Sequence, residues 1–335
     1  MTTEIKAQAP FEAPVVDQLA VRVVVDSFYE RFIPNPTHPS VAIEYVREIP
    51  GRQMSTLAGE WGLSLHLESA AAGAKAQYLL DFGYTPEVLN RNFDLLAIDP
   101  ARINGLILSH GHRDHYGGLA GFVAHHRTRM RDDLGLYIGA EDVFREKWIK
   151  GAGDQMASWG ALDRTALTAQ KVAPVCCGHP HALEGAFTTG YIERNSFERT
   201  SGGTMVASEN HFTDAERRGK LVKDQHPEEH ATCYIVKGRG LVVISSCGHA
   251  GIINSVKTAM AVSGVPKLHA VVGGFHLSPA PLDYIEHTVD ELEALNPDVV
   301  IPMHCTGVNF KEAMRRRMPE KLIAAYVGSR FTFGV

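Results

Sequence analysis

The order of hydrophobic and polar residues predicts a strand-rich beginning for this chain. Residues 19–26 form a short β-branched run, which is typical of a buried strand. Residues 61–68 alternate apolar and polar side chains, as expected of a half-buried strand, and residues 77–83 predict the next strand. A helix is expected over about 85–97, because Pro86 is favourable in a first helical turn. The chain is therefore predicted to begin as a β-meander that leads into a helix.

Short apolar runs alternate with helical patterns through the rest of the chain. A strand over 103–108 is predicted to precede a helix from residue 119, and a strand over 134–139 is predicted to precede a helix from Ala140. In the second half the predicted strands are 231–236, 240–245, 268–273 and 298–302, and the predicted helices are about 251–263, 281–295 and 309–317. This pattern predicts an α+β fold with helices outside the sheets.

Three segments lack this periodicity. Residues 1–18 contain Pro10 and Pro14 and are expected to form a loosely held leader, and residues 151–165 are expected to form a polar loop. Residues 202–230 are a charged insertion, which is either a plain surface loop, a lid over a site or an arm that contacts a second subunit. The sequence pattern leaves these alternatives open.

Composition narrows the class of protein. The chain has 335 residues, of which 44% are hydrophobic and 21% are charged, as in an ordinary soluble globular protein. The net charge of −5 provides no field that would recruit nucleic acid or an anionic membrane. No apolar run approaches the roughly 18 residues of a membrane span, and the N-terminus has no apolar signal segment. Five cysteines, an odd number, do not suggest a disulfide framework, so a cytoplasmic location is expected.

The chemistry of the chain is concentrated in residues 109–118, Ser-His-Gly-His-Arg-Asp-His-Tyr-Gly-Gly. Imidazole nitrogens and carboxylate oxygens are the ligands that hold Zn²⁺ and similar divalent metals. Because side chains two apart on an extended backbone point the same way, His110 and His112 are expected to hold one ion. Asp114 and His115 follow after the chain turns and are expected to face a second position. The segment therefore predicts a metal site.

The His-x-His-x-Asp-His motif after an apolar strand resembles the signature of the metallo-β-lactamase-fold superfamily. Six further segments resemble one branch of it, the proteins similar to dihydropterin-6-methyl-4-(ribofuranosyl)aminobenzene-phosphate synthase. They are residues 60–64 (EWGLS), 80–83 (LDFG), 188–194 (TTGYIER), 246–254 (SCGHAGIIN), 273–277 (GGFHL) and 302–307 (PMHCTG). The resemblance implies one domain over residues 1–335, built as a four-layer αβ/βα sandwich of two mixed β-sheets with helices outside. It also places the site at the sheet edge where strand ends meet.

The resemblance implies further metal ligands from the second half of the chain. His249 and His304 each come just after a predicted strand, so both are expected at the same sheet edge. One metal is then expected between His110, His112 and His249, and the other between Asp114, His115 and His304. The expected metals are two zinc ions, with manganese or iron as alternatives. His230 is a rival third ligand, near the position that other superfamily members use.

Cys247 departs from the superfamily pattern. Many members have a bridging aspartate in a Thr-Gly-Asp turn at this strand end, whereas this chain has Ser-Ser-Cys-Gly-His over residues 245–249. A thiolate can bind a metal, which makes Cys247 a candidate ligand. The alternative is a small buried residue and a site without a bridge.

Five other residues are candidate contacts around the metals. Asp81 and Glu60 are similar to acidic residues of the family. Asp81 is expected to hydrogen-bond the metal histidines or loop amides, and Glu60 either faces the substrate or holds a turn. His276 follows two glycines at a strand end, which predicts a side chain presented to a cavity for substrate contact or proton transfer, with a structural hydrogen bond as the alternative. Arg194 and Thr306 are candidate phosphate contacts, because the substrates named for the branch carry phosphate.

These residues predict a metal-dependent hydrolase. A divalent ion lowers the pKa of its water to about 7, and two ions about 3.5–4 Å apart stabilise the attacking and leaving oxygens. The expected substrate is a small ester, phosphoester or lactone-like molecule. Asp114 would orient the nucleophilic water and His276 would protonate the leaving group.

Other functions are kept as alternatives. The branch name implies a transferase that joins a pterin-methyl diphosphate to an arylamine, with the metals stabilising the diphosphate leaving group. A non-catalytic metal-binding or ligand-binding protein is the third hypothesis. A redox role is disfavoured, because His112 is kept where the diiron oxygen reductases of the superfamily have glutamate. The expected partner is a small molecule, either phosphorylated or not, and the 202–230 arm is compatible with a homodimer.

Overall fold

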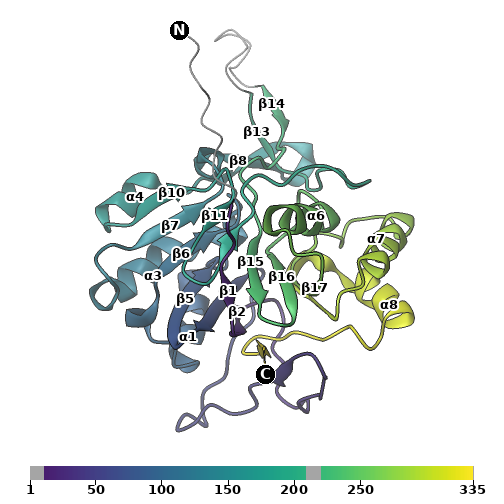
Figure 1. Cartoon of the computed structure of the whole chain (residues 1–335). Helices are drawn as coiled ribbons and strands as arrows, with labels where there is room; N and C mark the ends of the chain where they lie inside the picture. The colour runs from purple at the N-terminus through teal and green to yellow at the C-terminus, as the bar shows by residue number, and fades with distance from the viewer. Residues whose placement is uncertain (1–10, 209–219, 335) are drawn as a thin grey trace, which may run out of the picture.

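Two β-sheets pack face to face in the computed structural model, which describes residues 11–208 and 220–334. The first sheet has the strand order β10-β7-β6-β5-β4-β2-β19-β3. Its strands are β2 (Gln18–Val25), β3 (Ala42–Glu44), β4 (Ser64–Ala71), β5 (Ala74–Leu80), β6 (Gly105–Leu108), β7 (Gly135–Ile138), β10 (Ala173–Cys176) and β19 (Arg330–Phe333). Strand β19 comes from the C-terminus, so both ends of the chain contribute to this sheet (Figure 1).

The second sheet comes mainly from the C-terminal half and has the order β11-β12-β15-β16-β17-β18, with β1 beside β15. Its strands are β1 (Val15–Val16), β11 (His181–Ala182), β12 (Phe187–Thr188), β15 (Thr232–Val236), β16 (Gly240–Ser245), β17 (Leu268–Gly273) and β18 (Val299–Pro302). The four strands β15 to β18 lie within a residue of the runs that the apolar pattern predicted. Continuous apolar runs predict such strands well because these are buried on both faces.

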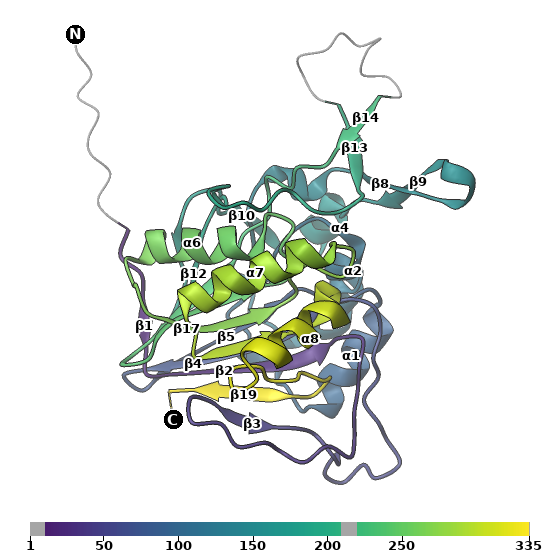
Figure 2. The same ribbon diagram turned by 90° about the vertical axis from the view of Figure 1, so that its right-hand side faces the viewer.

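Helices cover the outer face of each sheet (Figures 1 and 2). On the first sheet they are α1 (Pro86–Leu95), α3 (Leu119–His126) and α4 (Arg164–Ala169), and on the second α6 (Ile252–Ser263), α7 (Leu282–Leu295) and α8 (Val308–Arg317). Helix α1 begins as predicted, since Thr85 Oγ1 accepts a hydrogen bond from the Val88 amide and Pro86 occupies the first turn. The four-layer αβ/βα sandwich is thereby confirmed. Among the described residues, no helix combines the length and the apolar character that crossing a bilayer requires.

Apolar side chains between the two sheets hold the sandwich together. Leu65 and Phe331 of the first sheet and Tyr234 and Val242 of the second belong to one buried cluster. Separate clusters lie beneath the helices, with Phe93 and Phe122 under α1 and α3 in the first of them. Full burial of one such side chain contributes about 1.5–3 kcal/mol. The buried core therefore stabilises the strands from which the loops at the sheet edges start.

Parallel strands bring the candidate site together. Strands β5, β6, β7 and β10 run parallel, and so do β16, β17 and β18. Because the carboxyl ends of parallel strands share one sheet edge, the loops after β5 and β6 and those after β16, β17 and β18 meet there. These loops carry most of the residues that the sequence singled out.

A third sheet was not predicted. It has the order β14-β13-β8-β9, with β8 at Lys147–Lys150, β9 at Met156–Gly160, β13 at Met205–Ala207 and β14 at Leu221–Lys223. The expected helix from Ala140 is wrong, since only a 3₁₀ turn at Glu141–Phe144 precedes β8. The expected loop over 151–165 is also wrong, because it contains β9. The strands of this sheet are short and mostly half-buried or exposed on both faces, so they lack the regular apolar–polar alternation that identifies a strand with one buried face.

The leader and the insertion differ from expectation where they are described. Val15–Val16 pair with β15, and the Phe11 ring lies 5.7 Å from that of Phe187, so residues 11–18 are held against the second sheet. Within 202–230, β13 and β14 form an antiparallel hairpin next to β8, and most side chains of 224–230 are buried (Figure 2). The described part of the insertion is therefore more than a surface loop. Residues 1–10 and 209–219 lie outside the described residues.

Candidate metal centre

The loop after β6 delivers four buried ligand candidates to the sheet edge. Helix α2 (Arg113–Tyr116) begins directly after His112, and the amides of His115 and Tyr116 donate to the His112 carbonyl. His110, His112, Asp114 and His115 are all at most 5% exposed as whole residues. Position 117 at the end of the loop requires glycine, because a Cβ there would lie only 2.2 Å from the Tyr84 carbonyl oxygen. The loop is thus pressed against the segment that joins β5 to α1.

Asp114, His115 and His304 form one cluster of converging donors, which we call the Asp114 cluster. The Nε2 atoms of His115 and His304 lie 3.2 Å apart. Asp114 Oδ2 is 3.5 Å from His304 Nε2 and 3.9 Å from His115 Nε2. Asp114 Oδ1 is buried without a hydrogen-bond partner among the described residues. Burial alone would raise the pKa of Asp114, but the facing His115 and His304 imidazoles hold it well below its usual value.

Asp81 supports this cluster from behind. His115 Nδ1 donates to Asp81 Oδ2 at 2.6 Å, which leaves the His115 Nε2 lone pair directed at the cluster. The Ser109 amide and hydroxyl both donate to the same carboxylate, each at 2.8 Å. Asp81 has a left-handed φ of 58°, a conformation that costs energy in a residue with a Cβ. The structure places Asp81 in contact with a metal-ligand candidate, as the sequence analysis expected.

His110, His112 and His249 form the second cluster, which we call the His110 cluster. Their ring centroids are 4.6–4.9 Å apart. His110 Nδ1 donates to Ser109 Oγ at 2.9 Å, and His249 Nδ1 donates to the Ser201 carbonyl at 3.1 Å. The opposite nitrogens, Nε2 of His110 and His249, are buried and have no hydrogen-bond partner among the described residues. Burial lowers the pKa of all three rings, which favours the neutral form that binds metals.

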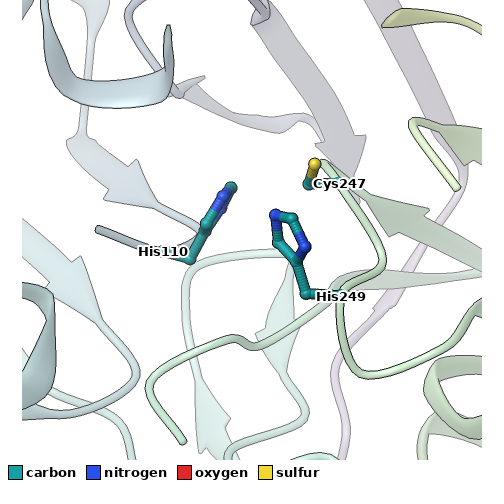
Figure 3. A group of neighbouring side chains, drawn as sticks. All are labelled: His110, Cys247 and His249. Atoms are coloured by element: carbon teal, nitrogen blue, oxygen red, sulfur yellow. The ribbon is translucent and has the colours of Figure 1, made fainter. Parts of the chain in front are cut away.

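Cys247 lies between the two clusters. The Cys247 Sγ atom belongs to two groups of potential metal donors. One group contains donor atoms of His110 and His249, and the other contains those of His115 and His304. Within each group all donor atoms lie within 4.8 Å of one another. In Figure 3 the sulfur and the rings of His110 and His249 face a common space. The sulfur also lies 3.2 Å from Cys305 Sγ and 3.3 Å from His276 Nδ1. A ligand shared by two ions would occupy this position.

The donor set fits two divalent ions. Donor atoms of His110 and His249 group with Cys247 Sγ, as do those of His115 and His304. Buried donor atoms without a partner among the described residues include Nε2 of His110 and His249 and Oδ1 of Asp114. A buried polar atom that lacks a partner costs about 1–3 kcal/mol, a cost that coordination would remove. Imidazole with one carboxylate and one thiolate suits zinc, iron or cobalt better than magnesium or calcium.

His226 joins the His110 cluster, and the sequence analysis missed it. Its ring is stacked on His249, with centroids 4.2 Å apart and planes at 17°, and it groups with His112 and His249 as a metal-ligand candidate. The His226 amide donates to Asp224 Oδ1, and burial lowers the pKa of the His226 ring to about 3. The only signal in the sequence was a histidine within a charged insertion, where the lack of apolar periodicity concealed its burial.

A buried charge network joins the insertion to the metal loop. Lys147 Nζ donates to Asp224 Oδ2 at 2.6 Å and to Glu228 Oε1 at 2.8 Å, and all three side chains are at most 2% exposed. The Gly111 amide donates to the same Glu228 oxygen. Thr204 Oγ1 lies 3.0 Å from His112 Nε2, so the insertion also contacts a ligand candidate directly.

Four further residues that the sequence singled out make hydrogen bonds within the protein. His230 Nε2 donates to the Leu108 carbonyl, so this ring supports β6. The Glu60 carboxylate accepts hydrogen bonds from the amides of Tyr84 and Thr85. Of its two predicted roles, it therefore has the one of holding a turn, just before α1. Thr306 Oγ1 donates a hydrogen bond to the Met303 carbonyl and accepts one from the Phe275 amide. The hydroxyl that was expected to bind phosphate is therefore engaged within the protein. Arg194 Nη2 donates to the Gln225 carbonyl.

A cavity of about 330 Å³ opens onto both clusters. Its lining includes His112, Asp114, His249 and His304, together with Cys247, Cys305, Trp61 and Trp159. His276 lines this cavity and also an adjoining one of about 220 Å³. The His276 backbone has a left-handed φ of 45°, and its ring centroid lies 4.2 Å from that of His249. The structure therefore presents His276 to a cavity, next to the metal-ligand candidates.

Comparison with known proteins agrees with this geometry. A family model described as the metallo-beta-lactamase superfamily matches residues 72–129. A 7,8-dihydropterin-6-methyl-4-(beta-D-ribofuranosyl)-aminobenzene-5'-phosphate synthase of Methanocaldococcus jannaschii is 29% identical over 279 residues, which are 81% of this chain and 90% of the relative. An uncharacterized protein of the same organism is 26% identical over 75% of this chain and 86% of its own length.

A solved structure shows the same fold. It is Tm1679, described as a metal-dependent hydrolase of the beta-lactamase superfamily, and it superposes with a TM-score of 0.67. The alignment covers 93% of this chain and 98% of that protein, at 23% sequence identity.

Proposed function

We propose that this protein, which has the metallo-β-lactamase fold, is a metal-dependent hydrolase of a small ester, phosphoester or lactone-like substrate. One observation carries the proposal: two clusters of buried imidazoles converge on either side of the Cys247 sulfur and open onto one cavity. A family model of the metallo-beta-lactamase superfamily matches residues 72–129, and Tm1679, which has the same fold, is described as a metal-dependent hydrolase. The substrate class is our inference from the donor set.

Each cluster has a defined part in the proposed reaction. His110, His112 and His249 would hold one ion, and Asp114, His115 and His304 the other, with Cys247 between them. The ions would polarise the scissile group and lower the pKa of a bound water to about 7. Asp114 Oδ1, which has no partner among the described residues, would accept a hydrogen bond from the attacking water and orient it.

Two other side chains complete the proposal. Asp81 would keep the His115 ring in the orientation that directs Nε2 at the metal position. His276 would give a proton to the departing oxygen, because it lines the cavity beside His249. The substrate is a small molecule that reaches the ions through this cavity.

A second candidate is a transferase that replaces water with an arylamine. Two observations favour it. The relative that covers 81% of this chain is named a synthase, and the cavity at the ions adjoins another one at His276, which gives room for a second organic substrate. In that reaction the ions would stabilise a diphosphate leaving group rather than generate hydroxide.

Isotope incorporation separates the two reactions. Zinc-loaded protein is incubated with phenyl esters and phosphoesters in ¹⁸O-labelled water, with and without aniline as the acceptor. A hydrolase places ¹⁸O in the product acid at a rate independent of aniline, whereas a transferase needs aniline and gives an unlabelled adduct. Metal-stripped protein serves as the control. Turnover that persists undiminished without metal would exclude both mechanisms.

A further inference from the structure

Cys247 and Cys305 are in contact at the metal centre, although they follow different strands of the second sheet. Cys247 comes after β16 and Cys305 after β18, and β17 lies between these two strands. Because neighbouring strands are about 4.8 Å apart, residues on β16 and β18 are about 9.6 Å apart, beyond the Cα separation of about 4.4–6.8 Å that a disulfide bond spans. The two sulfur atoms nevertheless lie 3.2 Å apart. The loops beyond the strands therefore converge.

Two glycines at the end of β17 allow this convergence. A Cβ at Gly273 would overlap the Ser245 carbonyl oxygen. A Cβ at Gly274 would overlap the Ser246 carbonyl oxygen and would lie 2.9 Å from Cys305 Sγ. A side chain at either position would hold the neighbouring loops apart. The glycine pair lets these loops close over the end of β17 and brings the two sulfur atoms together.

Hydrogen bonds hold the two cysteines side by side at the wall of a cavity. The His276 amide donates to Cys305 Sγ at 3.3 Å, and the Cys305 thiol donates to the Cys247 carbonyl at 3.4 Å. Both cysteines line the cavity of about 330 Å³ at the metal centre, through which a small solute reaches them. By contrast, Cys176 is exposed and Cys233 is buried among apolar side chains. Cys247 and Cys305 thus combine close contact with access from a cavity.

We propose that Cys247 and Cys305 are a site of oxidative modification, at which hydrogen peroxide converts the two thiols into a disulfide bond and removes Cys247 from the metal centre. The sulfur atoms are only about 1.2 Å farther apart than in a disulfide bond, so small rotations of the two side chains close the gap. The loss of metal rests on the metal centre of the proposed function, whereas formation of the bond does not.

The modification consumes one molecule of peroxide. The Cys305 thiolate, whose residue belongs to neither metal-ligand cluster, attacks one peroxide oxygen. The O–O bond breaks, the departing oxygen takes up a proton and leaves as water, and Cys305 becomes a sulfenic acid. The Cys247 thiolate then attacks the sulfur of this sulfenic acid, the S–S bond forms, and the S–O bond breaks to release a second water after protonation. Two thiols are oxidised to one disulfide, and one hydrogen peroxide is reduced to two waters.

The disulfide would change metal binding because the thiolate, rather than an oxidised sulfur, is the metal ligand. Cys247 Sγ groups with donor atoms of both clusters, so oxidation deprives both metal positions of a shared donor. Conversely, a metal ion on the Cys247 sulfur would keep this sulfur from attacking the sulfenic acid. Oxidation and metal binding therefore oppose each other.

Peroxide treatment followed by peptide mapping tests the proposal. Metal-stripped and zinc-loaded full-length proteins each receive one equivalent of hydrogen peroxide, and the remaining thiols are alkylated under denaturing conditions. Metal-stripped wild type is expected to lose two of its five thiols and to give a peptide pair joined through Cys247 and Cys305. Bound zinc is expected to slow this linkage.

Zinc affinity measured in competition with a chelator tests the consequence of the linkage. The linked protein is expected to bind zinc at least about a hundredfold more weakly than reduced wild type, because even loss of a group that only orients a ligand costs about 10–100-fold. Reduction with a phosphine should restore the affinity.

Two variants separate the linkage from general oxidative damage. Cys305→Ser retains Cys247 and every residue of the two clusters, and its zinc affinity is expected to be the same before and after peroxide. Cys176→Ser removes the exposed thiol and should still give the Cys247–Cys305 linkage.

Three results would overturn the proposal: no such linkage in metal-stripped wild type, undiminished zinc affinity in the linked protein, or an equal loss of affinity in Cys305→Ser. The linkage is mapped in wild type, so this part of the test does not depend on how a variant folds. Because no arm measures turnover, a protein that forms the linkage and loses zinc but hydrolyses no ester would contradict only the proposed function.

Discussion

The metal centre has two walls that are built in different ways. The strand-end wall consists of the loops after β5, β6, β16, β17 and β18, which parallel strands bring to one sheet edge above the apolar core. The insertion wall consists of the third sheet and residues 224–230, and buried ion pairs such as Lys147 with Asp224 hold it in place.

This contrast separates two tasks. The strand-end wall carries Cys247 and six ligand candidates of the two clusters, whose positions follow from the fold. The insertion wall carries one further candidate, His226, which groups with His112 and His249. It also carries Trp159, Ile149 and Thr204, which line the cavity. We infer that the first wall determines the type of chemistry and the second the choice of substrate. The predictions below test this division.

The largest expected effect belongs to the strand-end wall. Asp114→Asn removes a charged donor from the Asp114 cluster and the oxygen that would orient water. We expect kcat/KM for the hydrolysed ester to fall at least about a thousandfold, which corresponds to about 4 kcal/mol of transition-state stabilisation. Steady-state kinetics measures it, with the exposed Asp94→Asn as the matched control. A variant within about tenfold of wild type would remove Asp114 from the mechanism.

The stability of the insertion wall should depend strongly on the buried cation of Lys147. Lys147→Met leaves Asp224 and Glu228 buried without their cation, and we expect a loss of about 3 kcal/mol in the free energy of unfolding. Lys257→Met breaks a 2.8 Å ion pair with Glu291 at a partly exposed site and should cost less than about 1 kcal/mol. Urea denaturation of both variants gives the comparison. Similar losses in the two would mean that the buried network does not hold this wall.

Protonation of His66, in the sheet behind the strand-end wall, should lower the free energy of unfolding at acidic pH. This ring is buried on β4 and hydrogen-bonded to Gln77, and burial lowers its pKa to about 4. Because the unfolded chain binds the proton with a pKa near 6.5, the stability contribution is complete above pH 6.5 and is lost as the pH falls toward 4. Relative to His66→Gln, wild type should lose about 2 kcal/mol of unfolding free energy between pH 7.5 and 4.5. Parallel pH profiles for the two proteins would contradict this.

A smaller effect is expected where the two walls meet. Thr204→Val removes the hydroxyl that lies 3.0 Å from His112 Nε2 and preserves the side-chain shape. Groups that orient a metal-binding histidine affect metal affinity by about tenfold or more, so we expect a tenfold weaker zinc affinity in competition with a chelator. Thr168→Val, on the exposed face of α4, is the control. An unchanged affinity would show that the insertion wall does not support the His110 cluster.

The sequence predicted the strand-end wall far better than the insertion wall. Apolar runs located β15 to β18, and the motif over residues 109–118 brought four donors together within one loop. No such pattern marks β9 or the hairpin of β13 and β14, whose strands are short and only partly buried. His226 is buried next to the ion pair of Lys147 and Asp224, a long-range pairing that local periodicity does not encode. Local periodicity also could not predict the contacts of Thr306. Its hydroxyl hydrogen-bonds to Met303 and Phe275, which lie beside it only in the folded chain.

Metal stoichiometry tests the central claim most directly. Elemental analysis is made on tag-free wild type and on His249→Ala and His304→Ala, each altered in a different cluster, after zinc loading and removal of free metal. The two-ion arrangement predicts about two equivalents per chain in wild type and about one in each variant, with near-native circular dichroism in all three. About one equivalent or none in wild type would contradict it, and so would a variant that keeps both ions.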